Sequence, residues 1–263
     1  MKRTHLDLFS GIGGFSLAAE SVGFTTVGFS EIDPYATKLL KQHWPDVPNH
    51  GDIRITDFNG CRPELITGGD PCPCHSRARS NGASKHPDLS GYFLALVARL
   101  RPRWVVRENV PAPTVAHFAA ALEAIGYGTV VVRTNAGSFT AQTRQRDFIV
   151  GSDSVPGTHL KRTLLSAICD DGAGAYETRL GTRPVAPALT THRTRYDSRD
   201  CYIYEPGTLR ILESEEREAL AGFPRGWTDG FSPATRARML GNSLVPQVAA
   251  EIIKAMIESE WTR

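Results

Sequence analysis

The clearest indication of the fold class is the stretch LDLFSGIGGFSLAAES, residues 6–21. Its apolar run Leu6–Phe9 has the character of a buried strand, the glycines that follow form a turn, and Phe15–Ser21 has helical character. Strand-like and helix-like segments continue to alternate along the chain up to Gly151. Such alternation is typical of a parallel sheet with helices on both faces, so we predict an α/β fold.

The alternating pattern extends from this first unit through most of the chain. Further strands are predicted at Thr25–Phe29, Leu65–Gly68, Trp104–Arg107, Thr129–Arg133 and Phe148–Val150. Further helices are predicted at Pro34–His43, Tyr92–Leu100, Val115–Ile125, Leu212–Leu220 and Val245–Ile257. Residues 152–208 are rich in Gly, Thr, Pro and Arg and show little periodicity. We therefore predict a large domain at 1–152, a small irregular domain at 153–235, and a C-terminal segment at 236–263 whose helix returns to the large domain.

Composition is that of an ordinary globular protein. The 263 residues are 41% hydrophobic and 22% charged, and no apolar run approaches the roughly 20 residues that span a bilayer. The N-terminus leads directly into a strand-like segment, and five cysteines do not form a disulfide framework, so a cytoplasmic location is predicted.

Charge is nearly balanced overall but unevenly distributed. The net charge is +2, which does not by itself indicate nucleic-acid binding. Basic residues gather in two places, at Arg77, Arg79 and Lys85, and at Arg193, Arg195 and Arg199. Arginines interleaved with Ser, Thr and Tyr suit contacts with phosphate groups, although a solvated surface would have the same composition.

The Gly-rich turn after the first strand has the features of a cofactor site. Glycine allows the backbone to approach a ligand closely, and the helix that follows favours an anionic group at its N-terminus. Glu31, twenty residues beyond Gly11, ends the second strand, where an acid would take ribose hydroxyls. Asp52 could accept from an adenine amino group. Each acid taken singly could instead be a solvated loop carboxylate.

The spacing of the glycines narrows the choice of cofactor. A dinucleotide fingerprint needs a third glycine where this chain has Ser16, so a nicotinamide cofactor is disfavoured. A cofactor with adenosine and a carboxylate but no pyrophosphate fits better, which points to S-adenosylmethionine.

Reactive side chains lie at the ends of three of the later predicted strands. Cys72 lies in GGDPCPCHS, residues 68–76, in a Gly/Pro-rich turn after a buried strand, and is a candidate nucleophile. A half-buried structural cysteine is the alternative for such a residue in isolation. Glu108 ends the next strand, and Arg144 and Arg146 alternate in QTRQR, residues 142–146. If this segment is extended, the two arginines point the same way.

Taken together, these motifs resemble those of the DNA cytosine-C5 methyltransferase family over nearly the whole chain. The matching segments are DLFSGIGG at 7–14, GDPC at 69–72, ENV at 108–110, QTRQR at 142–146, the stretch from Arg210 to Pro224, and GNSLVP at 241–246. The resemblance implies a Rossmann-like S-adenosylmethionine-dependent methyltransferase fold with a small irregular second domain. It makes 1–152 the cofactor-binding catalytic domain and 153–235 a small target-recognition domain.

The resemblance also implies the chemistry. The Cys72 thiolate adds to C6 of cytosine, Glu108 donates a proton or hydrogen bond at N3, and Arg146, supported by Arg144, holds O2. The base must be flipped out of double-stranded DNA, with residues 76–89 as a mobile loop. The residues implied in cofactor binding are Phe9, Ser10, Gly11, Gly13, Gly14, Glu31, Ile32, Asp52, Ile53, Asp70, Asn242 and Ser243.

Departures from the family pattern lie around the nucleophile and in the recognition segment. Pro73 replaces the usual glutamine, His75 replaces the usual phenylalanine, and Cys74 adds a second thiol. Register with Gly-x-Pro-Cys favours Cys72, and a Cys72/Cys74/His75 metal site has weak spacing for zinc. The short recognition segment predicts a short or relaxed target sequence.

Other functions stay open at this point. They are a tRNA cytosine-C5 methyltransferase, a catalytically inactive DNA-binding accessory subunit, and transfer of a bulkier group. We expect the protein to be a monomer and to be of the bacterial or phage type. It would act either within a restriction-modification system or as an orphan enzyme without a partner restriction enzyme.

Overall fold

A computed structural model of the chain describes residues 3–71, 88–140, 142–153, 177–178, 181–182, 189, 202–205 and 208–258. Six strands form one sheet in the order β2-β1-β3-β4-β6-β5. They are β1 (Thr4–Leu8), β2 (Thr25–Ser30), β3 (Leu65–Gly68), β4 (Trp104–Asn109), β5 (Gly128–Asn135) and β6 (Gln145–Ser152). The predicted α/β class is confirmed.

One strand runs against the predicted direction. β1 to β4 pair in parallel, whereas β6 is antiparallel to both β4 and β5. Only residues 136–144 connect β5 to β6, with a single turn of 3-10 helix at Ala136–Ser138. A parallel crossover needs a dozen or more residues, so this connection permits only antiparallel pairing. The prediction of a wholly parallel sheet is therefore wrong for β6.

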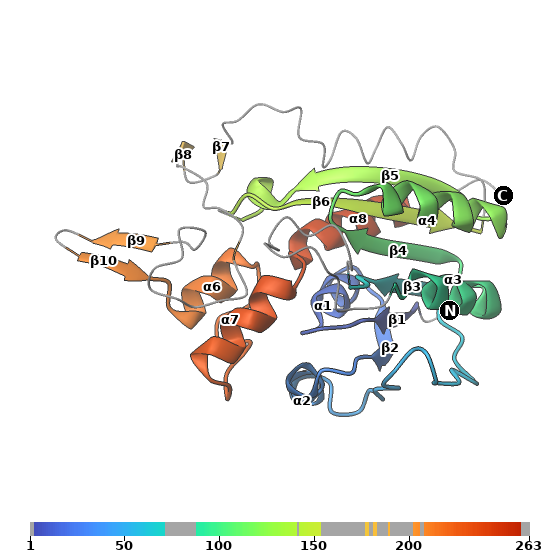
Figure 1. Cartoon of the computed structure of the whole chain (residues 1–263), viewed down its shortest axis with the longest axis horizontal. Helices are drawn as coiled ribbons and strands as arrows, with labels where there is room; N and C mark the ends of the chain where they lie inside the picture. Colours follow the sequence, from blue (N-terminus) through green and yellow to red (C-terminus); the bar gives the residue numbers. More distant parts are fainter. Residues whose placement is uncertain are drawn as a thin grey trace.

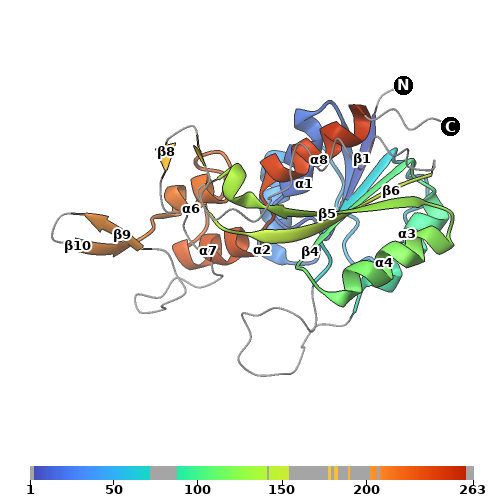
Figure 2. The same ribbon diagram turned by 90° about the horizontal axis from the view of Figure 1, so that it is seen from above.

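Helices cover both faces of the sheet (Figure 2). α1 (Gly14–Ser21) and α8 (Pro246–Glu258) pack together on one face, and α3 (Ser90–Leu100) and α4 (Pro113–Ala124) lie on the other. Each face has its own apolar core, because alternate residues of a strand point to opposite sides. Val106 packs with Phe15 and Ile252, whereas the neighbouring Val105 packs with Phe93.

The order of strands creates a switch point at the centre of the sheet. β1 lies between β2 and β3, so the chain leaves β1 toward one edge and resumes at β3 toward the other. In open α/β sheets, ligands bind in the crevice at the carboxyl ends of the strands at such a point. The Gly-rich turn after β1 and the turn after β3 flank this position.

The C-terminal part adds helices beside the sheet. α6 (Ser214–Leu220) and α7 (Pro233–Asn242) share an apolar cluster with α2 (Pro34–His43), to which Ile12, Leu39, Trp227 and Leu240 belong. The hairpin of β9 (Tyr202–Glu205) and β10 (Thr208–Ile211) extends away from the sheet (Figure 1). The two short strands β7 (Glu177–Thr178) and β8 (Gly181–Thr182) also pair.

α7 was not predicted from the sequence. Its buried face is made of Arg236, Ala237, Met239 and Leu240, so an arginine takes one of the inward positions. Because hydrophobic periodicity counts such a position as polar, the helical pattern is hidden.

The division into domains at 152 and 235 stays a prediction.

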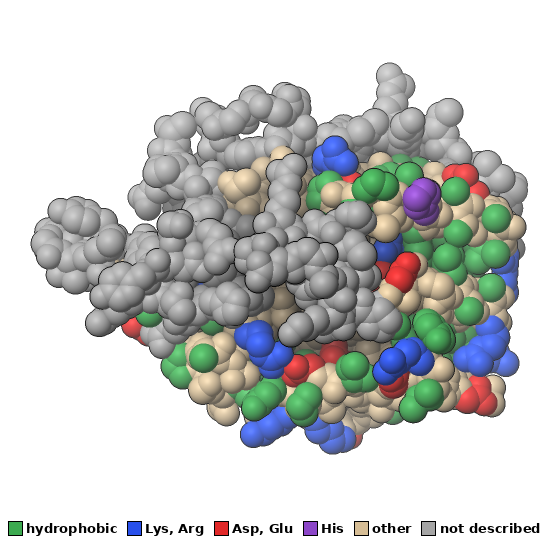
Figure 3. Space-filling model, in the orientation of Figure 1, with side chains coloured by type: hydrophobic (Ala, Val, Ile, Leu, Met, Phe, Trp, Pro, Cys, Tyr) green, Lys and Arg blue, Asp and Glu red, His purple; other side chains and the backbone are tan. Residues whose placement is uncertain are grey.

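The described surface carries mixed charge. Figure 3 shows Lys and Arg side chains beside Asp, Glu and apolar side chains on the described part of this face, with no patch of one sign. The two predicted basic clusters lie outside the described residues. Within the described part of the chain, no helix is long and apolar enough to cross a membrane.

Candidate active site

The Gly-rich turn leaves β1 through backbone conformations that glycine favours. Gly11 has φ 53° and Gly13 has φ 81°, both in the left-handed region, and Phe9 also has a positive φ of 51°. A side chain at Gly11 would meet nothing closer than 4.0 Å, the carbonyl oxygen of Phe9. The backbone at Gly11 is therefore open to a ligand, as the prediction of a cofactor turn requires.

Glu31 is tied to the same turn. Its Oε2 accepts from the backbone N–H of Gly11 at 2.7 Å, and its Oε1 accepts from those of Ile32 and Asp33 at 2.8 and 2.7 Å. Burial raises the pKa of Glu31, and these three hydrogen bonds oppose the shift. A carboxylate has about four lone-pair positions, so two ribose hydroxyls would have to share or replace one of these backbone donors.

The other residues predicted to bind the adenine end of the cofactor differ in how exposed they are and in whether they already have a partner within the protein. Ile32 beside Glu31 is 65% exposed, which offers an apolar surface for a flat ring. The Asp52 carboxylate already pairs with Arg54 at 2.6 Å, and this arginine lowers the pKa of Asp52. Ile53 is buried in the core beneath α3 and α4. Cofactor contact by Asp52 and Ile53 stays a prediction.

Packing explains the two glycines that follow in the turn. A side chain on Gly13 would lie 2.5 Å from the ring of Trp44, and one on Gly14 would lie 3.2 Å from Leu244. Ser16, which replaces the third glycine of a dinucleotide fingerprint, donates from Oγ to Oδ2 of Asp7 at 2.8 Å. This hydrogen bond ties α1 to β1.

Two further predicted residues use their polar groups within the protein. Ser10 Oγ donates to the backbone oxygen of Asp7 at 2.6 Å, and Ser243 Oγ donates to that of Leu240 at 2.9 Å. Asn242 at the end of α7 is exposed. Their contacts with a cofactor stay predictions.

A loop between α6 and α7 supports the cofactor turn from the side. Trp227 donates from Nε1 to the backbone oxygen of Ile12 at 3.0 Å. Its ring stacks on His43 of α2 with centroids 3.7 Å apart and planes within 7°. Trp227 was not predicted from the sequence, because its partner is 215 residues away in the chain.

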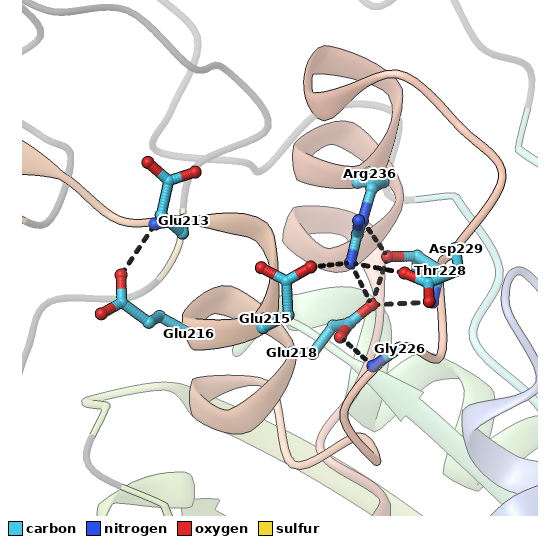
Figure 4. Close-up of polar contacts among 8 residues, drawn as sticks. All are labelled: Glu213, Glu215, Glu216, Glu218, Gly226, Thr228, Asp229 and Arg236. Atoms are coloured by element: carbon cyan, nitrogen blue, oxygen red, sulfur yellow. Dashed lines mark hydrogen bonds and ion pairs between the residues drawn. The ribbon is translucent and has the colours of Figure 1, made fainter.

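Buried charges hold this loop in place (Figure 4). Glu218 of α6 is fully buried and accepts from the backbone N–H groups of Gly226 and Thr228 at 2.6 and 2.7 Å. Arg236 reaches from α7 to Glu218 at 2.9 Å and to Asp229 at 3.1 Å. These contacts fix the backbone of Gly226 and Thr228, the residues on either side of Trp227 in the chain.

The catalytic side of the site lies at the ends of β3, β4 and β6. Glu108 Oε1 forms an ion pair with Nε of Arg146 at 2.7 Å, and both side chains are mostly buried. A side chain on Gly69, the first residue after β3, would lie 3.3 Å from Oε2 of Glu108. The acid therefore stands directly against the turn that leads to the predicted nucleophile.

Arg144 completes this group. It is buried, and its Nη2 donates to the backbone oxygens of Ser243 and Gly241 at 2.6 and 3.3 Å. Its Nε is buried without a hydrogen-bond partner among the described residues. Burial and the neighbouring charge of Arg146 lower the pKa of Arg144 to about 9, so it is still positively charged at pH 7.

Gln142 of the same motif connects the sheet to the C-terminal part. Its amide donates from Nε2 to the backbone oxygen of Leu220 at 2.6 Å and accepts at Oε1 from the N–H of Leu189 at 3.2 Å. Residues from three distant segments thus meet at the start of β6.

Asp70 has a partner that was not predicted from the sequence. Its carboxylate accepts from Nε and Nη2 of Arg107 at 2.5 and 2.8 Å, and both side chains are 2% exposed. The signal was an arginine inside the apolar run WVVR, since a buried charge requires a partner. Asp70 as a cofactor ligand stays a prediction.

The predicted nucleophile and its neighbours cannot be placed in this geometry. Cys72, Cys74 and His75 lie outside the described residues, as does most of the loop predicted at 76–89. Within the part of the chain that is described, no three His, Cys, Asp or Glu side chains are grouped to hold a metal ion.

Comparison with protein families gives a match over almost the entire chain. Residues 3–164 and 171–258 match the model of the C-5 cytosine-specific DNA methylase family. The chain belongs to this family. The Gly-rich turn, Glu108, Arg144 and Arg146, which lie at the carboxyl edge of the parallel strands, all fall within the matched residues.

Related type II methyltransferases differ in how much of their length this chain covers. It is 37% identical to the type II methyltransferase M.HgiCII of Herpetosiphon aurantiacus over 56% of this chain, but covers 36% of that protein's length. It is 24% identical to M.HindV of Haemophilus influenzae, with 97% of this chain and 96% of that protein covered.

Solved structures share the fold. A Spodoptera frugiperda DNMT2 mutant matches with a TM-score of 0.76 and 17% identity over 97% of this chain and 100% of its own. Dnmt2 methyltransferase of S. pombe matches with a TM-score of 0.73 and 17% identity over 98% and 99%. Both matches confirm the predicted Rossmann-like fold.

Proposed function

We propose that this chain is a DNA (cytosine-5-)-methyltransferase that uses S-adenosylmethionine. The observation that carries the proposal is the ion pair of Glu108 with Arg146 beside the buried Arg144, with Glu108 close to Gly69 in the turn after β3. The carboxyl group of Glu108 and the guanidinium of Arg146 match the N3 and O2 atoms of cytosine, and Arg144 supports Arg146.

The residues of the Gly-rich turn fit the proposed cofactor. Gly11 leaves open space for a ligand, Glu31 places a carboxylate beside it, and Ile32 offers an exposed apolar face. S-adenosylmethionine, when bound there, supplies an electrophilic methyl group. The protein's part is to hold the adenosine end beside Glu31 and to exclude water from the reacting atoms.

The reaction itself is a covalent addition followed by elimination. The Cys72 thiolate forms a bond to C6 of cytosine, and the ring electrons move toward C5 while Glu108 donates at N3. Arg146 and Arg144 stabilise the charge at O2. C5 then takes the methyl group that the cofactor would supply and loses its own proton to solvent. The Cys72 thiolate leaves C6 and N3 returns its proton to Glu108, which restores the ring.

Double-stranded DNA is the proposed partner, and the target base must leave the stack to reach these groups. The segment between Gly151 and Arg210 is short, so we propose a short or relaxed recognition sequence. A strict site of about six base pairs read by direct contacts would contradict this proposal. A monomeric state and a cytoplasmic location stay predictions.

Methyl transfer from tritiated S-adenosylmethionine tests the function and the nucleophile together. Purified wild type is incubated with mixed-sequence duplex DNA and, in parallel, with tRNA. Cys72→Ser and Cys74→Ser variants are compared, since the second thiol provides a matched control two residues away. We expect label at cytosine C5 of DNA that is lost in Cys72→Ser and kept in Cys74→Ser.

Other outcomes of this assay have defined meanings. Label in tRNA but not in DNA would assign the tRNA reaction. Cofactor binding without transfer to either nucleic acid would favour an accessory subunit. Loss of transfer in Cys74→Ser with retention in Cys72→Ser would reverse the assignment of the nucleophile.

A further inference from the structure

The turn that leads to the nucleophile begins where sheet pairing ends. Gly68 on β3 and Arg107 on β4 form the last paired positions of these two strands. Gly69 and Asp70 follow beyond that last pair, so no hydrogen bond of the β-ladder fixes their distance from Glu108. Side chains of β4 supply the connection instead.

Two contacts from β4 hold Asp70. Arg107 donates two N–H groups to its two carboxylate oxygens at 2.5 and 2.8 Å, and Asn109 donates from Nδ2 to its backbone oxygen at 3.2 Å. The guanidinium of Arg107 lies over the ring of Phe118 in α4, 4.4 Å from its centroid. Paired donors and a stacked face fix the orientation of this guanidinium as well as its position.

Stability of the fold is a weak reason for such a pair. Both side chains are 2% exposed, so two charges have been removed from water. Replacing a buried ion pair by apolar side chains of similar volume is often neutral or stabilising. Apolar residues would suit this face, where Phe93 and Phe118 already pack. The ion pair thus adds geometric precision that apolar packing lacks.

We propose that Asp70 and Arg107 are positioning residues, which hold the turn before Cys72 at a fixed distance from Glu108. Glu108 follows Arg107 directly in β4 but points to the opposite side of the strand, because side chains of a strand alternate. One strand end therefore presents the acid on one side and anchors the nucleophile turn on the other. This inference rests on the proposed methyltransferase function.

Two variants test the inference. Arg107→Lys keeps the buried charge balanced but cannot bind both carboxylate oxygens with a planar pair of donors. The double variant Asp70→Leu/Arg107→Met replaces the pair by apolar side chains. Arg103→Lys is the matched control, since Arg103 precedes the same strand at its opposite end and pairs with Glu64 at 3.6 Å on the surface.

Four quantities are measured for each variant: kcat for methyl transfer to DNA, KM for DNA, Kd for S-adenosylmethionine, and Tm. We expect both test variants to lose about a hundredfold in kcat, because displacement of a reacting group by about 1 Å costs that much. For Arg107→Lys, the Kd for S-adenosylmethionine and the Tm should stay near those of the wild type, and Arg103→Lys should match the wild type in all four quantities.

The outcomes separate this inference from the function on which it rests. Wild-type kcat in a folded Arg107→Lys or in the folded double variant would overturn the positioning role and leave the function intact. If the double variant does not fold, Arg107→Lys decides the question. No methyl transfer by the wild type would overturn both.

Discussion

Glu108 and Arg146 show how single residues become a site. Each was predicted from its place at one end of a strand, and β4 and β6 bring them within 2.7 Å of each other. Because β6 is antiparallel to β4, the start of β6 meets the end of β4. The same reversal places the buried Arg144 beside this pair.

Glu108→Gln should impair the chemical step. Glutamine keeps the size of the side chain but cannot donate a proton at N3, so kcat should fall by about 10²- to 10⁴-fold. Binding of S-adenosylmethionine, measured by calorimetry, should be unchanged. Glu64→Gln, at the opposite end of the sheet, is the control and should retain activity. Equal kcat in Glu108→Gln and the wild type would remove Glu108 from the mechanism.

The loop between α6 and α7 shows what neighbouring elements contribute. Trp227 joins this loop to the Gly-rich turn through Ile12 and to α2 through His43. Glu218 and Arg236 hold the loop from α6 and α7. A segment more than two hundred residues away in the chain therefore holds the Gly-rich turn of the proposed cofactor site.

Trp227→Phe should weaken cofactor binding more than catalysis. Phenylalanine keeps a flat ring against His43 but lacks the N–H that binds the Ile12 oxygen. A hydrogen bond of about 0.5–1.5 kcal/mol predicts a rise of about two- to tenfold in KM for S-adenosylmethionine. Steady-state kinetics at saturating DNA measures KM and kcat separately. Tyr92→Phe, on the exposed side of α3, is the control, and a change confined to kcat would contradict the prediction.

A buried polar chain crosses the middle of the whole molecule. His5 Nε2 lies 2.8 Å from Thr67 Oγ1, which donates to Oδ1 of Asp7 at 3.2 Å. Burial raises the pKa of Asp7 to about 8 and lowers the pKa of His5 to about 3. These groups join β1 to β3 directly beneath both functional turns.

The two shifts have opposite consequences for folding. The pKa of Asp7 rises from 3.8 to about 8 on folding, so its stabilisation is complete below pH 3.8 and is lost as pH rises through 8. The pKa of His5 falls from 6.5 to about 3, so its stabilisation is present above pH 6.5 and is lost as pH falls toward 3. Between about pH 4 and 6.5 the two contributions to the pH dependence of the unfolding free energy cancel. Above pH 6.5 only the contribution of Asp7 remains.

Asp7→Asn should therefore alter the pH dependence of stability. Relative to this variant, the wild type should lose about 2 kcal/mol of unfolding free energy between pH 6.5 and pH 8, at about 1.4 kcal/mol per pH unit. Urea denaturation at both pH values measures the difference. Asp46→Asn, in an exposed loop after α2, is the control. Parallel pH profiles for Asp7→Asn and the wild type would show that Asp7 is ionised in the folded protein.

Local patterns in the chain specified most elements and the chemistry of the site. Leu65–Gly68 and Pro34–His43 were predicted with the observed bounds, because runs of apolar residues and a proline start are local signals. Glu31 and Glu108 were identified for the same reason, since each lies at the end of a predicted strand. Such signals require no knowledge of distant residues.

Pairing between distant segments was decided by the folded structure. The reversal of β6, the Asp70–Arg107 pair and the contact of Trp227 with Ile12 each join residues far apart in the chain. α7 remained hidden because its inward Arg236 is neutralised by acids from α6 and the following loop. A charge can be buried only beside its partner, and periodicity in the sequence records the position of a side chain but not the identity of its neighbour.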